Sequence, residues 1–206
     1  MQYFIQEYFK ETIFIKILNQ NVMAILDEQQ NLLNENSVSM QPVIVKWGLI
    51  SAIVSIIFQL ISSLIGFGSM AFVLTLLNLG ISIYLLIMAV RVDRDEQLGG
   101  YASFKRVFLL TFAIIMISTI ITQVFSYVYM NFINPSAADA ALESAKAIME
   151  KFNMPEERMD KALEEASANI KSPMNIVKTS LWAAVIGAII AAIYAAAMKK
   201  EKAMFE

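Results

Sequence analysis

The chain contains no cysteine and no histidine. These absences exclude disulfides and thiol catalysis, and they remove the commonest general base and most zinc ligands. Charged residues are scarce at 17%, the formal net charge is -2, and no block rich in arginine or lysine lies beside aromatic residues, which argues against a nucleic-acid partner. We therefore expect a protein that is not an enzyme, with no catalytic residue, no cofactor and no metal site.

Long apolar runs are what the sequence has in abundance. Hydrophobic residues make up 58% of the 206 residues, and the mean hydropathy is +0.59. A helix that crosses a membrane needs about 20 mostly apolar residues. Four runs reach that length: 47–67, 71–90, 107–133 and 175–200. We therefore predict an all-α membrane protein with four transmembrane helices.

The runs divide the chain into five parts. Residues 1–40 form an extension that we interpret as an amphipathic or disordered cytoplasmic segment, or as sequence upstream of a true start at Met23 or Met40. The second part, 41–133, contains the first three spans and a basic cytoplasmic loop at 91–106. An acidic helical segment at 134–173, the fourth span at 174–200 and a cytoplasmic tail at 201–206 follow.

Charges at the ends of the runs predict an orientation. The loop 91–106 carries four basic residues, all close to membrane ends, and the fourth run ends in two lysines. Short cytoplasmic loops collect such residues. We therefore expect both termini in the cytoplasm and the acidic segment outside it.

Two stop-start signals, at 134–136 and 153–155, predict two helices in the acidic segment. The second helix has a narrow apolar seam formed by Met159, Leu163, Ala166 and Ile170. We predict that the two helices pack on each other as a hairpin. The alternative is that this face docks a partner helix or lies on the membrane surface.

Uncharged polar residues recur inside the first three runs. Because the spans alternate in direction, Gln59, Asn78 and Gln123 all fall at or outward of the middle of the membrane, so they can meet. We interpret them as a structural clamp of hydrogen bonds, with the lining of a small-solute path as the alternative. The clamp is favoured because these runs contain no Asp, Glu, Lys or Arg, whereas ion-coupled carriers usually place such a residue in a span.

The fourth run contains a stripe of small residues at intervals of four: Ala183, Gly187, Ala191 and Ala195. Small residues at this spacing allow two helix backbones to approach closely. The stripe therefore predicts a packing surface, either within the monomer or in a homodimer.

Several local features together carry a family resemblance. They are "KWGL" at 46–49, "RVDRDEQLGGYASFKR" at 91–106, "MPEERMDKALEEA" at 154–166, and the lysines that end the fourth run before a terminal "FE". In these features the chain resembles the domain of unknown function 4199 family. The most family-like loop positions are Gly99, Gly100, Tyr101 and Phe104, and the glycines suit a tight re-entry of the third span. The resemblance implies a small four-span protein of the bacterial inner membrane, chiefly from Bacteroidota, and it brings no catalytic residue.

Two functions of different classes fit these observations. The first, which we favour, is a non-enzymatic membrane component that binds partner proteins or stabilises an assembly. Its expected partners are the lipid bilayer and a second copy of the chain or other membrane proteins. The alternative is a small oligomeric transporter or channel, through which a neutral solute passes along the amide and hydroxyl side chains.

Overall fold

The computed structural model describes residues 16–23, 25–26, 35–65 and 69–200. The predictions for most of the extension, the turn between the first two runs and the tail fall outside these residues. Within them the structure is helical and contains no strand, only an isolated antiparallel bridge between Ala102 and Lys200. The prediction of an all-α protein is confirmed.

Four helices in the described part of the chain are long and apolar enough to cross a membrane, so the chain is a multi-pass membrane protein. They are α2 (Gln41–Ile65), α3 (Ser69–Arg91), α4 (Phe104–Val128) and α7 (Met174–Met198). Two of them continue as π-helical turns, α3 as η1 (Val92–Gln97) and α4 as η2 (Tyr129–Ile133). The helices and the apolar runs have different ends. An apolar run shows which residues suit a lipid environment, whereas a helix continues for as long as its backbone hydrogen bonds do.

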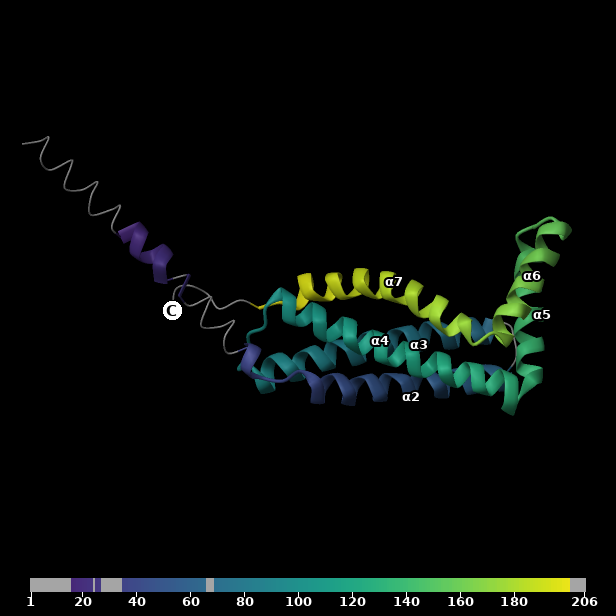
Figure 1. Cartoon of the computed structure of the whole chain (residues 1–206), viewed down its shortest axis with the longest axis horizontal. Coiled ribbons are helices and arrows are strands. Elements are labelled where there is room, and N and C mark those ends of the chain that lie inside the picture. The colour runs from purple at the N-terminus through teal and green to yellow at the C-terminus, as the bar shows by residue number, and fades with distance from the viewer. Residues whose placement is uncertain (1–15, 24, 27–34, 66–68, 201–206) are drawn as a thin grey trace, which may run out of the picture.

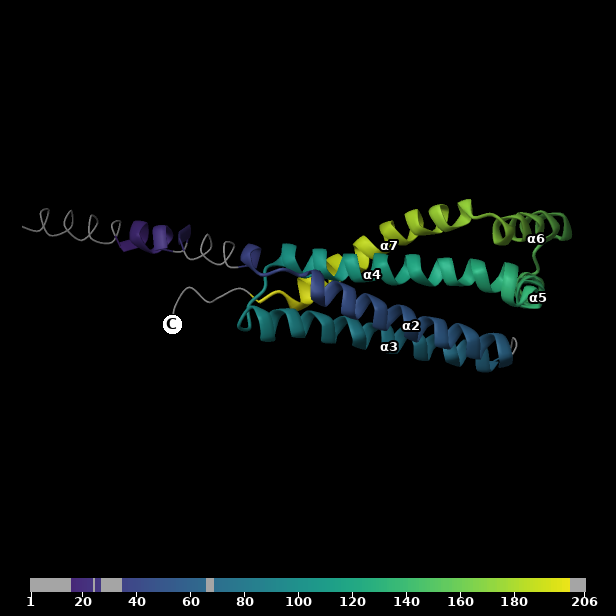
Figure 2. The ribbon, with the colours of Figure 1, turned by 60° about the horizontal axis from the view of Figure 1, so that its bottom comes forward.

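Helix α4 lies at the centre of the arrangement (Figure 1). It packs most extensively against α7 and next against α2, whereas α3 packs mainly on α2. Figure 2 shows the α2 and α3 pair diverging from α4 and α7 toward one end of the spans. The position of α4 therefore determines how the other three spans are placed.

Two glycines mark where other spans approach α4 closely. A Cβ atom on Gly48 of α2 would lie 2.9 Å from Cγ2 of Ile117, and one on Gly187 of α7 would lie 3.1 Å from Cγ2 of Ile115. Ala191 and Ala195 of α7 are fully buried, and Ala183 is partly buried. The small-residue stripe of the fourth span thus packs within the chain, against α4.

Helices α5 (Pro135–Lys151) and α6 (Glu156–Lys171) form a hairpin that lies across one end of the spans (Figure 1). We call this the hairpin end. Helix α6 packs mainly on α5. In its seam Met159 is buried, and Leu163, Ala166 and Ile170 are partly buried. The predicted docking face is therefore largely covered by the chain itself.

Replacement of Gly187 by leucine should destabilise the fold, because the new side chain meets Ile115 and Phe112 of α4. Overpacking of this kind costs about 1–3 kcal/mol. Gly80→Leu is the matched control, since a Cβ there meets no atom within 4 Å. Thermal unfolding of the purified variants in detergent measures the difference. Equal melting temperatures for the two would contradict the close approach of α7 to α4.

Candidate functional site

A polar, largely open cavity of about 470 Å³ lies between α2, α3 and α4. Gln59, Asn78 and Gln123 all line it, one from each helix. Six residues with hydroxyl groups complete most of the wall: Ser55, Ser62, Thr75, Ser118, Thr119 and Thr122. The structure therefore brings the three predicted amide residues to one site, which we call the span cavity.

Helical periodicity explains why these side chains share the site. Ser55, Gln59 and Ser62 recur at intervals of four and three on α2, and Ser118 and Thr122 are four apart on α4, so each set lies on one face of its helix. All three amides lie in the half of their helix that is nearer to the hairpin end. Because Ser55 and Ser118 also line it, the span cavity extends from near the middle of the spans toward the hairpin end.

One cross-helix hydrogen bond of the kind predicted for a clamp is present, between Gln59 of α2 and Ser126 of α4. In the described part of the chain, Gln59 Oε1 accepts a hydrogen bond from Ser126 Oγ at 2.9 Å, whereas Asn78 Oδ1 is buried without a partner. No described hydrogen bond joins any two of the three amides. A buried amide without a partner costs about 1–3 kcal/mol in proteins. The Asn78 oxygen is therefore a hydrogen-bond acceptor that the described residues leave unused.

The walls of the span cavity restrict what can bind there. Among its described lining residues there is no Asp, Glu, Lys or Arg. A charged ligand would lose its hydration and find no counter-charge, which is costly in a membrane interior. Amides and hydroxyls supply both donors and acceptors. The cavity suits a neutral molecule that forms hydrogen bonds, and its volume lies within the range of small-molecule pockets, about 300–1,000 Å³.

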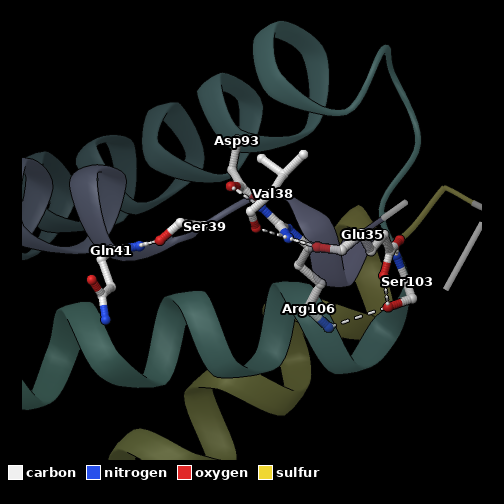
Figure 3. Close-up of polar contacts among 7 residues, drawn as sticks. All are labelled: Glu35, Val38, Ser39, Gln41, Asp93, Ser103 and Arg106. Carbon is white, nitrogen blue, oxygen red and sulfur yellow. Dashed lines mark hydrogen bonds and ion pairs between the residues drawn. The ribbon is translucent and has the colours of Figure 1, made fainter. Parts of the chain in front are cut away.

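At the opposite end of the spans, a buried ion pair joins η1 to α4 (Figure 3). The guanidinium of Arg106 donates to both carboxylate oxygens of Asp93, with Nε to Oδ2 at 2.7 Å and Nη2 to Oδ1 at 2.8 Å. The two side chains are only 4% and 2% exposed. Arg106 Nη1 also donates to the carbonyls of Val38, at 2.9 Å, and Glu35. The guanidinium is thus almost fully paired, as a buried charge requires.

Glu35 attaches the segment before α2 to the same place. Its carboxylate accepts hydrogen bonds from the backbone N–H and the hydroxyl of Ser103, each at 2.6 Å. Ser103 is the N-cap of α4, and its Oγ accepts from the backbone N–H of Arg106 at 3.3 Å. We call Glu35, Val38, Asp93, Ser103 and Arg106 the arginine clasp. It fixes the start of α4 against two other segments.

The family-like loop leads into the arginine clasp. Gly99 and Gly100 have φ values of 68° and 97°, a region that glycine adopts without strain. Ala102 then forms both hydrogen bonds of its bridge with Lys200, each at 3.0 Å, and the ammonium of Lys200 lies 5.6 Å from the ring centre of Tyr101. Phe104 is exposed and stacks on Phe108, with ring centres 6.3 Å apart. The loop thus connects the end of α7 to the start of α4.

Sequence reasoning missed the arginine clasp. Arg106 was counted with the charges that face the cytoplasm, but it is buried against Asp93. Their separation of 13 residues has no helical periodicity, and Glu35 lies in a segment without an apolar pattern. The one available signal was the presence of acidic residues between basic ones in the loop 91–106. The described residues contain no group of three His, Cys, Asp or Glu side chains that could hold a metal ion.

Comparison with known proteins gives one result. Residues 46–200 match the family described as "Protein of unknown function (DUF4199)". No curated protein and no solved structure matches the chain. The matched range includes every residue named for the span cavity, and Asp93, Ser103 and Arg106 of the arginine clasp. Glu35 and Val38 lie before it.

Arg106→Met should strongly destabilise the protein, because it leaves the Asp93 carboxylate buried and unpaired. Breaking a buried ion pair in this way costs about 3–5 kcal/mol, whereas replacing both partners by apolar residues is often tolerated. The double variant Asp93→Leu with Arg106→Met should therefore recover much of the loss in thermal unfolding experiments. Lys161→Met is the control, since its ion pair with Glu157 is 70% and 83% exposed. A single variant as stable as this control would contradict the buried pair.

Proposed function

The chain belongs to the DUF4199 family, and from that premise and its span cavity we propose that it binds a small neutral solute within the membrane and carries it across, as a small transporter or channel. The observation that carries the proposal is the position of Gln59, Asn78 and Gln123. They come from three different spans and line one cavity, and the buried Oδ1 of Asn78 has no partner among the described residues.

Solutes with hydroxyl or amide groups fit the span cavity best. Such a molecule replaces the water hydrogen bonds that it loses with bonds to the wall, so little free energy is lost on entry. An apolar molecule would leave the wall amides unpaired. A charged molecule would lack a partner of opposite charge among the described lining residues. Small polyols and amides are therefore the solutes to test first.

We propose further that the protein lies in a bacterial inner membrane with the arginine clasp on the cytoplasmic side. Exposed basic residues gather at that end of the spans: Lys46, Arg91, Lys105, Lys199 and Lys200. Arg106 does not add to this charge, because Asp93 neutralises it. Positive charge next to the spans favours a cytoplasmic location, which leaves the hairpin end on the outer side.

A second candidate function, binding of a partner protein, is favoured by a different observation. Near the turn of the hairpin, Ile148 is 53%, Phe152 80% and Met154 38% exposed. Large apolar side chains exposed close together are common at interaction sites. This surface, and not the covered seam of Met159 and Leu163, is where such a partner would bind.

If the protein transports a neutral solute, proteoliposomes that contain it should swell faster than empty liposomes in at least one of urea, glycerol and small polyols. Asn78→Leu and Gln59→Leu should abolish this acceleration, since each removes an amide from the span cavity, while the melting temperature stays near that of wild type. Leu77→Val, an exposed position on α3, is the control. Swelling that the protein does not accelerate for any of these solutes would contradict the transport proposal.

Partner binding predicts a cross-link of defined mass from the hairpin. A photoreactive benzoylphenylalanine in place of Phe152 should yield one protein adduct in native membranes. The same residue in place of Ala147, which is exposed on a different face of α5, should not yield that adduct. Lipid adducts alone, or the same proteins from both positions, would count against this second function.

A further inference from the structure

A second cavity, of about 210 Å³, lies where the end of α4 meets α6 and the start of α7. Gln123, Ser126 and Tyr127 of α4 form one wall, Asn169 belongs to α6, and Asn175 belongs to α7. All of these side chains carry hydrogen-bonding groups, and Met130, Ile170 and Ile176 add apolar surface. The second cavity therefore lies at the hairpin end, and like the span cavity it has no charged residue among its described lining residues.

The two cavities adjoin at a pair of residues. Gln123 lines both of them. Ser126 lines the second cavity and donates its hydroxyl at 2.9 Å to Gln59 Oε1, and Gln59 lines the span cavity. The two spaces are therefore adjacent at Gln123, and the hydrogen bond from Ser126 to Gln59 lies beside that point.

Other hydrogen bonds hold the second cavity in shape. Asn131 Nδ2 donates to the carbonyl of Tyr127 and to the carbonyl of Ile170, both at 2.9 Å. The same amide therefore joins the end of α4 to the end of α6. These bonds fix the wall of the second cavity at its α6 side, whereas the described side-chain bond between α2 and α4 next to Gln123 is the one from Ser126 to Gln59.

We infer that the second cavity is the entrance through which a neutral, hydrogen-bonding solute reaches the span cavity from the hairpin end, with Gln123 and the Gln59–Ser126 hydrogen bond as the narrow point. The inference rests on the proposed function and adds the route and its selectivity. A solute with a hydroxyl or amide group can exchange bonds with Gln59 and Ser126 as it passes. A hydrocarbon would break the Gln59–Ser126 bond without replacing it, so the narrow point selects against apolar molecules.

Because the chain has no natural cysteine, single introduced thiols can test the route in lipid nanodiscs, where both membrane faces are accessible. Thr122→Cys places a thiol at the span cavity, and Ile120→Cys places one on the exposed, lipid-facing side of the same helix. The probe is methyl methanethiosulfonate, and intact mass gives the rate. Thr122→Cys should react at least about tenfold faster, because the reactive thiolate forms in water and not in lipid.

The entrance is then blocked. In a variant with both Thr122→Cys and Ser172→Cys, a polyethylene-glycol maleimide of several kilodaltons is attached at position 172, which lines the second cavity. Attachment should slow the reaction at position 122 to near the rate at Ile120→Cys. The same polymer at Ala140→Cys, exposed on α5, controls for bulk and should leave the rate unchanged.

Each result decides the inference. If the polymer at position 172 does not lower the labelling rate at position 122, the inference is overturned, because the reagent then reaches the span cavity by another route. A thiol at position 122 as slow as that at 120 would overturn it too, and Ser118→Cys repeats the measurement at the same cavity if Thr122→Cys fails to fold. Labelling requires no transport, so the two proposals can fail separately. If the polymer at position 172 slows labelling at position 122 but the protein does not accelerate swelling, transport alone is refuted. If the polymer does not slow labelling but the protein does accelerate swelling, the entrance alone is refuted.

Discussion

The buried ion pair between Arg106 and Asp93 is the interaction on which the rest of the structure depends. Both charges are almost completely removed from water, which costs several kcal/mol per ion unless each hydrogen-bonding group is paired. The pairing is achieved by drawing three segments together: the π-helical turn after α3, the start of α4 and the residues before α2. Because α2 and α7 both pack on α4, fixing the start of α4 also sets the positions of the cavity walls.

The two ends of the spans solve the problem of polar groups in a membrane differently. At the clasp end, charges are neutralised by charges, and a guanidinium with fixed geometry leaves little freedom for the segments around it. At the hairpin end the polar groups are neutral amides and hydroxyls, and part of their bonding capacity is unused. The first arrangement suits a rigid base. The second leaves groups that can exchange hydrogen bonds, which is what the proposed binding of a neutral solute requires.

Much of the fold could be predicted from the sequence, because a membrane imposes length and apolarity on each span. Asn-Pro signals also predicted the two hairpin helices, and alternating span direction placed Gln59, Asn78 and Gln123 at one depth. Periodicity gives the face of a helix but not its partner, so the choice between clamp and cavity needed the structure. The arginine clasp could not be predicted, since Asp93 and Arg106 stand in a charged loop of the kind that water usually solvates. Asn169 and Asn175 belong to different helices, and only the folded chain brings them to one cavity.

The bridge between Ala102 and Lys200 has a consequence for how the protein is made. All partners in the arginine clasp precede the fourth span in the sequence, so the clasp can form while the ribosome is still translating α7. The bridge, the bond from Arg94 to the carbonyl of Met198 and the whole contact of α7 with α4 must wait for that last span. Until α7 is inserted, the side of α4 that it covers has no partner within the chain, so we expect the three-span stage of synthesis to be the one most open to misassembly.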